Sequence, residues 1–306
     1  MRVLITGATG TLGLALADTL GARGDEVVAL SRDPERGQRV LGEGVEVHAW
    51  PEPTQAPPPA RALGGVEAIV HLLGEPVAQR WTGEARTRIR ESRVLGTRML
   101  VQAVRDLPAA RRPKALISQS ATGYYGPRGD APLDEHASAG DDFLAQVVVA
   151  WEAEATEAQS MMRVALTRTG VVLSPEGGAL AKMLPFFKLG VGGPVAGGQQ
   201  YVPWIHRDDV VGALICCVDD TTADGPVNLT APNPVTNTEL SRALGRALGR
   251  PAVLPVPAFA IKLLYGDMAE MVTTGQRAVP ARLRQLGYEF HHPEVEPALR
   301  DVLSGQ

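Results

Sequence analysis

The stretch Val3-Leu-Ile-Thr-Gly7-Ala-Thr-Gly10-Thr-Leu-Gly13 decides the fold class of this 306-residue chain. Its apolar, partly β-branched start predicts a strand, and Leu12, Leu16 and Leu20 recur every four residues, which predicts a helix directly after the glycines. A glycine-rich turn between a strand and a helix lets the backbone approach a pyrophosphate, and the helix N-terminus offers free N–H groups and a partial positive charge. The opening residues therefore predict a dinucleotide-binding βαβ unit.

The rest of the first half alternates strand and helix patterns. Strands are expected at 26–30, 68–73, 115–118 and 164–167, and helices at 86–104 and from Trp151 onward, with a proline-rich surface loop at 51–59. Strands that alternate with helices form parallel sheets with both faces covered. We therefore predict the α/β class, as a Rossmann-type doubly wound parallel sheet.

The composition of the sequence changes from Val171 onward. Glycines and prolines crowd residues 174–203, and helices are expected near 210–218 and 240–248. We predict a nucleotide-binding Rossmann domain at residues 1–170, to which segments near 204–235 return. The remainder, residues 171–306, is predicted to form a smaller α+β C-terminal lobe.

The end of the second strand points to the cofactor. An Asp or Glu there would accept hydrogen bonds from the ribose hydroxyls of NAD. This chain has Ser31-Arg32 instead, with Arg36 soon after. A guanidinium pairs with a 2′-phosphate, and the missing carboxylate removes repulsion toward it. The sequence thus predicts NADP, against the simpler interpretation of a surface arginine.

Composition and charge exclude several classes of partner. The net charge of -4 argues against nucleic acid, which clustered Lys and Arg would hold. No apolar run is long enough to span a membrane, and the N-terminus enters a strand without a signal-like apolar segment, so we expect a cytoplasmic protein. The adjacent Cys216 and Cys217 are expected to be small helix residues, and the histidines and carboxylates show no metal-ligand spacing, so no metal is predicted.

Motifs along nearly the whole chain resemble one family, the extended and atypical short-chain dehydrogenase/reductases. The first motifs are Gly7-Ala-Thr-Gly-Thr-Leu-Gly13, His71-Leu-Leu-Gly-Glu-Pro76, Ser92-Arg-Val-Leu-Gly-Thr97 and Ser120-Ala-Thr-Gly-Tyr-Tyr-Gly126. Further motifs are Gly140-Asp-Asp-Phe-Leu-Ala145, Trp151-Glu152, Arg168-Thr-Gly-Val-Val-Leu173, Gly192-Gly-Pro194 and Pro203-Trp-Ile-His206. Within that group the chain resembles the NAD-dependent epimerase/dehydratase-like family with a small C-terminal domain of unknown role, expected here at about 253–300.

The resemblance implies a set of cofactor contacts. The pyrophosphate would be held by Gly7, Thr9, Gly10, Thr11, Leu12 and Gly13, and the adenosine phosphate by Ser31 and Arg32. Further contacts would come from Leu72, Leu73, Gly74, Arg88, Arg93 and, near the nicotinamide, Val172. The alternatives are that Leu72 and Leu73 belong to the strand core and that Arg88 lies on a solvated helix face.

The acid/base pair of active short-chain reductases is missing. Those enzymes use a Tyr four residues before a Lys, but no Tyr-x-x-x-Lys occurs in this chain, and the matching helix reads Phe143-Leu-Ala-Gln-Val147. The resemblance makes Ser120 the active-site serine. Tyr124 and Tyr125 in the same loop are the candidate proton donors, against a structural role.

His206 is a further candidate acid or base. It precedes the helix near 210–218, which Asp208 or Asp209 is expected to cap, and a structural role is favoured for its imidazole.

Two functions fit these observations. The first is an NADP-dependent oxidoreductase or epimerase-like enzyme that acts on a small carbonyl or hydroxyl compound with a modified acid/base set. The second is a catalytically silent NADP(H)-binding sensor or scaffold. The oligomeric state stays open, with a homodimer among the alternatives.

Overall fold

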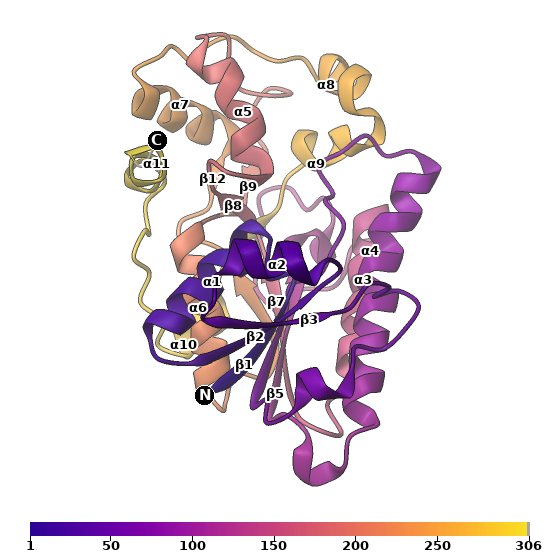
Figure 1. Ribbon diagram of the computed structural model, residues 1–306. Helices are drawn as coiled ribbons and strands as arrows, with labels where there is room; N and C mark the ends of the chain where they lie inside the picture. Colours follow the sequence, from indigo (N-terminus) through magenta and orange to yellow (C-terminus); the bar gives the residue numbers. More distant parts are fainter. Residues whose placement is uncertain (305–306) are drawn as a thin grey trace.

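A seven-stranded parallel sheet forms the centre of the computed structural model, which describes residues 1–304 (Figure 1). The strand order is β11-β7-β5-β4-β1-β2-β3, and each neighbouring pair is parallel. The strands are β1 (Arg2–Thr6), β2 (Glu26–Ser31), β3 (Val45–Ala49), β4 (Ala68–His71), β5 (Ala115–Ala121), β7 (Arg163–Thr169) and β11 (Gly225–Leu229). This topology confirms the predicted doubly wound α/β class, and its order reverses between β1 and β4, where such sheets bind ligands.

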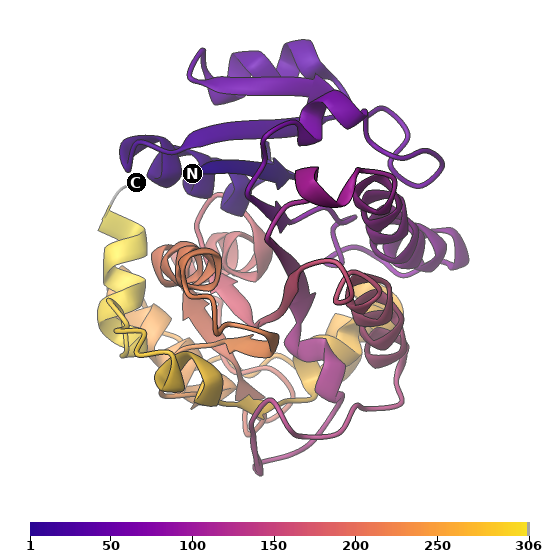
Figure 2. The same cartoon turned by 90° about the horizontal axis from the view of Figure 1, so that it is seen from below.

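Helices cover both faces of the sheet (Figure 1 and Figure 2). One face carries α1 (Thr11–Ala22) and α6 (Arg207–Asp219), and the other carries α3 (Gly83–Arg105) and α4 (Phe143–Thr156). Successive residues of β1 serve the two cores in turn: Val3 and Ile5 pack on the α1 side, and Leu4 packs on the α3 side. A strand buried on both faces must be apolar throughout, which explains the uninterrupted run at the start of the chain.

Side-chain caps fix where several helices begin. Asp33 accepts a hydrogen bond from the Arg36 amide at 3.0 Å and so caps α2 (Pro34–Leu41), which lies against β2 and β3. The cap of α6 differs from the prediction, because His206 Nδ1, and not Asp208 or Asp209, accepts the first free amide, that of Asp208, at 3.1 Å. The Asp209 carboxylate instead accepts amides from a distant loop.

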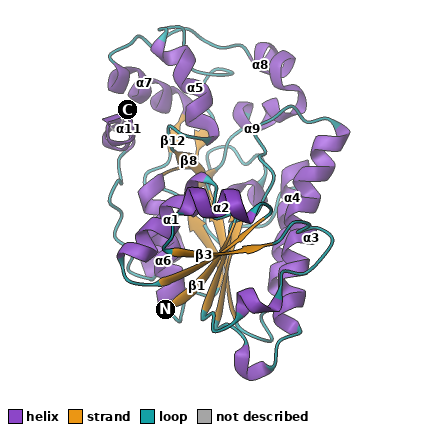
Figure 3. Cartoon of the chain, viewed as in Figure 1, coloured by secondary structure: helices purple, strands orange, loops and turns teal. Residues whose placement is uncertain are grey.

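A lobe of helices and short strand pairs lies beyond the carboxyl ends of the sheet strands (Figure 1 and Figure 3). Its core joins α5 (Gly178–Lys188), α7 (Asn237–Leu248) and α11 (Val295–Ser304) around the fully buried Trp204. The strand pairs are β8 (Val171–Leu173) with β10 (Trp204–His206), β9 (Tyr201–Val202) with β12 (Val235–Thr236), and β6 (Pro132–Leu133) with β13 (Arg277–Ala278). The remaining helices are α8 (Ala258–Tyr265), α9 (Glu270–Thr273) and α10 (Ala281–Gln285).

The returning segment near 204–235 contributes both α6 and the edge strand β11 to the nucleotide-binding half. The division at residue 170 stays a prediction, and the last two residues of the predicted lobe lie outside the described residues. Within residues 1–304, no helix has the length and apolar character that crossing a membrane requires.

Candidate functional site

The glycine turn brings backbone amides to the carboxyl end of β1. Gly7 has φ +67°, and a Cβ there would lie 2.8 Å from the Leu72 carbonyl oxygen. A Cβ on Gly13 would lie 2.4 Å from the Gly7 carbonyl oxygen, so the first turn of α1 packs directly on the loop. The amides of that first turn have no partner inside the helix. Their partial positive charge makes the turn a ready anion site for a phosphate group.

The end of β2 presents an unpaired cation. The Arg32 side chain is exposed and has no hydrogen bond or ion pair with any residue in 1–304. The next residue, Asp33, is occupied by its capping bond to α2, and Ser31 Oγ donates to the Asp33 carbonyl at 2.7 Å. This corner of the sheet therefore offers an available guanidinium, while its nearest carboxylate in sequence is engaged.

The predicted contacts after β4 separate into different environments. Leu72 packs with the core on the α1 side and Leu73 with the core on the α3 side, and Gly74 is exposed. Arg93 Nη1 donates to the Glu75 carbonyl at 2.9 Å, and a Cβ on Gly74 would lie 3.1 Å from the Arg93 guanidinium carbon. Arg93 thus supports the loop, and its burial lowers the pKa of the guanidinium to about 10.

Arg88 and Val172 have different surroundings. Arg88 is exposed and pairs with Glu84 on its own helix at 2.5 Å and with Glu75 of the loop after β4 at 3.7 Å. Val172 packs against the core on the α1 side, while its neighbour Val171 lines the pocket described below.

Ser120 belongs to a closed polar network beneath the sheet end. Its hydroxyl donates to Glu152 Oε1 at 2.5 Å, and its side chain is only 2% exposed. Glu152, on α4, also accepts two hydrogen bonds from the Arg168 guanidinium of β7, at 2.8 and 2.9 Å. Although burial by itself lowers the pKa of Arg168, the bonds and charge of Glu152 raise it overall. Arg168 and Glu152 therefore form a stable buried ion pair, and the Ser120 hydroxyl is engaged in a hydrogen bond to its carboxylate.

Tyr125 completes the network from the other side. It is fully buried, its hydroxyl donates to Asn228 Oδ1 at 2.7 Å, and it accepts a hydrogen bond from Arg168 at 3.2 Å. Burial raises the pKa of this phenol to about 12, against the opposing charge of Arg168. Tyr124 is half-buried with the Arg168 guanidinium carbon 3.4 Å from its ring centre, and its hydroxyl has no hydrogen bond to a residue in 1–304. The three predicted catalytic residues thus lie together, but two of their hydroxyls are committed to structural partners.

A pocket of about 160 Å³ opens between the sheet end and the C-terminal lobe. Its apolar wall includes Trp81, Leu144, Met183, Leu240, Met271 and Val272. Its polar wall includes Thr122, Asp142, Gln200, Tyr201, Asn237, Glu270 and Gln276. Ser120, Tyr124 and Tyr125 are not among the residues that line it in the described part of the chain.

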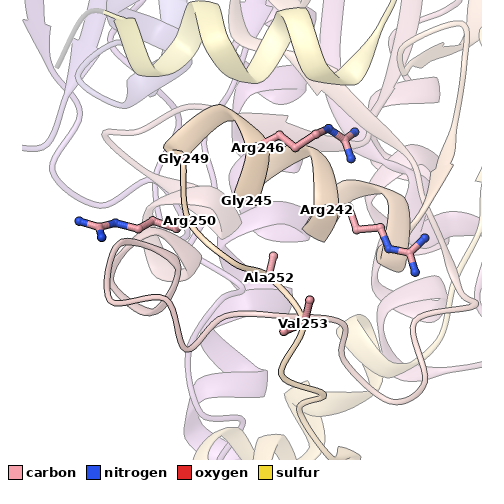
Figure 4. Close-up of a pocket in the computed structure, with 7 residues that line it drawn as sticks. All are labelled: Arg242, Gly245, Arg246, Gly249, Arg250, Ala252 and Val253. Carbon is pink, nitrogen blue, oxygen red and sulfur yellow. The ribbon is translucent and has the colours of Figure 1, made fainter.

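A hollow of about 280 Å³ at the end of α7 is less suited to bind a ligand. Figure 4 shows the side chain of Arg250 directed to the opposite side from those of Arg242 and Arg246. Arg246 is also paired with Glu296 at 2.7 Å. The open hollow therefore lacks a convergent set of donors.

The fold also brings together histidines and carboxylates whose spacing in the sequence is not that of metal ligands. Potential ligand atoms of His206, Asp208, His292 and Asp301 lie within 4.8 Å of one another. The rings of His206 and His292 are stacked 3.7 Å apart, and burial together with the charge of His292 lowers the pKa of His206. His206 Nδ1 caps α6, whereas its buried Nε2 lies 3.3 Å from Asp301 Oδ2 and makes no hydrogen bond to a residue in 1–304. His206 therefore caps α6 with one ring nitrogen and has the other free of a hydrogen-bond partner among the described residues.

The sequence contained only partial signals for these site residues. Glu152 and Arg168 stand within family-like motifs, but their partnership is invisible until α4 packs on β5 and β7. Thr122 lies in the same motif as Ser120, two positions later. Tyr201 and Glu270 carry no local signal, because two different segments of the lobe bring them to the pocket.

Comparison with known proteins identifies close relatives. The NAD dependent epimerase/dehydratase family model matches residues 3–229, and a domain of unknown function, DUF1731, matches residues 256–302. Epimerase family protein Mb2239 of Mycobacterium bovis is 42% identical and covers 97% of this chain and 96% of its own length. The chloroplastic SDR39U1 homolog of Arabidopsis thaliana is 39% identical over 99% of this chain and 87% of its own length. These matches confirm the resemblance inferred from the motifs.

Solved structures share the whole fold. Human epimerase family protein SDR39U1 (isoform 2), crystallised with NADPH, has a TM-score of 0.90 and 35% identity, with 100% of each chain covered. UDP-glucuronic acid 4-epimerase from Bacillus cereus, solved with UDP-glucuronic acid and NAD, has a TM-score of 0.78, 14% identity and coverage of 100% of this chain and 99% of its own. The second likeness concerns the fold alone.

Proposed function

Because the chain belongs to the NAD-dependent epimerase/dehydratase family, we propose that it binds NADP(H) and transfers hydride to or from a small carbonyl or hydroxyl compound. The observation that carries this proposal is the unpaired Arg32 guanidinium at the end of β2, beside the amides of the glycine turn. The pyrophosphate would bind at those amides and the 2′-phosphate at Arg32. NADPH in the human relative supports the same cofactor.

The chemistry needs a proton donor in place of the missing Tyr-Lys pair. Of the sequence-derived candidates, Ser120 and Tyr125 have their hydroxyls engaged in the buried network, and Tyr124 lies beneath Arg168. Tyr201 lines the pocket, and its hydroxyl has no hydrogen bond to a residue in 1–304. Arg277 lies over the Tyr201 ring, 5.0 Å from its centre, and orients it. We assign the proton-donor role to Tyr201.

Cofactor choice is tested by the Arg32→Asp variant. Replacing the guanidinium by a carboxylate removes an ion pair with the 2′-phosphate and adds repulsion, so NADPH affinity is expected to fall at least about tenfold relative to NADH. Titration calorimetry with both dinucleotides measures the ratio. Arg111→Asp is the matched control, since the Arg111 side chain is exposed and has no partner among residues 1–304, and it precedes the amino end of β5, whereas Arg32 follows the carboxyl end of β2. An unchanged NADPH/NADH ratio in Arg32→Asp would contradict the assignment.

The second candidate function is a silent NADP(H) sensor or scaffold. It is favoured by the missing dyad and by the engagement of Ser120 and Tyr125 in the network. A carbonyl panel with NADPH separates the two functions: loss of absorbance from reduced cofactor supports the enzyme. A panel without turnover, combined with NADPH-dependent changes in hydrogen exchange of the lobe, would favour the sensor. A homodimer stays a prediction for either function.

A further inference from the structure

The pocket between the sheet and the lobe is small. Its volume of about 160 Å³ is close to that of the roughly 150 Å³ cavity that holds a single benzene ring. Sites for drug-sized ligands span about 300–1,000 Å³. A nucleoside diphosphate sugar, with a base, a ribose, two phosphates and a hexose, is therefore too large to be enclosed whole in this space. A compound of one ring, or of similar bulk, fits it.

The charge of the pocket wall is negative. Among its described lining residues, the charged side chains are the carboxylates of Asp142 and Glu270. Asp142 Oδ1 accepts the Leu144 and Ala145 amides at 2.8 and 3.0 Å, so it is partly compensated by the start of α4. Glu270, at the start of α9, is exposed and its carboxylate has no partner in residues 1–304. An unpaired carboxylate attracts a cation or a hydrogen-bond donor and repels a phosphate.

Cations on the surrounding elements already have partners. Arg86 forms an ion pair with Asp267 at 2.6 Å. Lys182 donates to the Ala78 carbonyl, and Arg277 lies over the ring of the pocket tyrosine and donates to a backbone carbonyl at 3.4 Å. Lys182 and Arg277 keep their charge, but neither is among the described residues that line the pocket, so the unpaired charge within the lining is that of Glu270.

We propose that the pocket takes a small, non-phosphorylated carbonyl compound with an apolar body and a cationic or hydrogen-bond-donating group, and that the Glu270 carboxylate binds that group. The apolar wall around Trp81, Leu144 and Met183 holds the body of the compound. This inference rests on the proposed function, since it concerns the substrate of the same site. It assigns to this chain a substrate class different from nucleotide sugars.

Three para-substituted benzaldehydes of similar size test the proposal on protein saturated with NADP+. The cationic probe is 4-(dimethylaminomethyl)benzaldehyde, the neutral probe of the same shape is 4-isobutylbenzaldehyde, and the anionic probe is 4-(carboxymethyl)benzaldehyde. UDP-glucose is the fourth ligand. Titration calorimetry is expected to give the cationic probe a Kd about fivefold lower than the neutral one, the upper range for one surface ion pair. The anionic probe and UDP-glucose are expected to bind more weakly than the neutral probe.

Variants locate the effect. Glu270→Gln is expected to abolish the advantage of the cationic probe while leaving the neutral probe unchanged. Glu289→Gln makes the same charge change at an exposed residue outside the described pocket lining, and the advantage should persist. Equal Kd values for the cationic and neutral probes, or tighter binding of the anionic probe or UDP-glucose, would overturn the inference and leave the proposed function intact. Failure of NADP+ itself to bind would overturn the proposed function and the inference with it.

Discussion

The buried network and the pocket use similar side chains in opposite ways. The network (Ser120, Tyr125, Glu152, Arg168 and Asn228) is closed, and each of these polar side chains bonds to another member. In the pocket, the Tyr201 hydroxyl and the Glu270 carboxylate have no hydrogen-bond or ion-pair partner among residues 1–304. A satisfied buried group stabilises the fold, whereas an unsatisfied accessible group is available to a ligand. Whether a polar side chain has hydrogen-bond partners, more than its residue type, therefore distinguishes a structural residue from one that is available to bind a ligand.

The largest effect is expected from breaking the network at its cation. Arg168→Met leaves the buried Glu152 carboxylate without its countercharge, and loss of one partner from a buried pair costs about 3–5 kcal/mol of unfolding free energy. Urea denaturation measures this loss. The control is Arg98→Met, which removes an exposed ion pair with Glu154 on the same helix α4 and should cost no more than about 1 kcal/mol. Equal losses in the two variants would show that the network is not the more important support.

The next effect is a pH dependence from His71, a second closed polar group. His71 is fully buried, with Nδ1 2.7 Å from Thr6 Oγ1 and Nε2 3.0 Å from Thr97 Oγ1. Burial lowers its pKa from 6.5 to about 3, so protons bind the unfolded chain more strongly. The stabilisation is complete above about pH 6.5 and falls as the pH drops toward 3, by roughly 1.4 kcal/mol per unit.

Urea denaturation at about pH 7 and pH 5 should therefore show a loss of roughly 2 kcal/mol from this group. His71→Asn retains hydrogen-bonding capacity without titrating in this range, and the variant is expected to lose correspondingly less stability between the two pH values. If the wild-type protein and the variant lose the same amount, His71 is not the responsible group.

The smallest effect on stability is expected from the two tyrosines, and it sharpens the comparison between them. Tyr125→Phe leaves Asn228 Oδ1 without its donor and should cost about 1–2 kcal/mol of unfolding free energy while turnover of a carbonyl substrate is retained. Tyr201→Phe should change stability by less than about 0.5 kcal/mol and lower turnover at least about hundredfold. Urea denaturation and NADPH oxidation give the two values. The opposite pattern would return the proton-donor role to Tyr125.

The elements that the sequence predicts best are those with a local signal. The strand at the start of the chain, the glycine turn and α1 follow from neighbouring residues, and the structure has them as β1 and α1. The sequence pattern does not predict the strand β3, although Val45-Glu-Val-His-Ala49 alternates, because a short, half-exposed strand carries a weak pattern. It does not predict the edge strand β11 either, since Gly225-Pro226 begins it and both residues are uncommon inside strands.

The candidate site shows the limit of local patterns. The sequence predicts Ser120, Tyr124 and Tyr125 in one loop after the strand at 115–118, but Ser120 lies within β5 and the two tyrosines lie in the short 3-10 helix that follows it. Their sequence also does not indicate which hydroxyls have partners. The partner of Tyr125 is 103 positions away and that of Ser120 is 32 positions away. No local periodicity reports such distances, because they depend on which helix packs on which strand.

The sequence by itself determined the parallel α/β framework, the glycine turn after β1, the cation at Arg32 and the missing Tyr-Lys pair, since each depends on residue types at short spacing. Only the tertiary structure decided that Arg168 and Glu152 enclose Ser120, and that Tyr201 and Glu270 share a pocket. Burial and partnership arise when distant segments meet. They set the electrostatic environment of a side chain, which the order of residues along the chain does not contain.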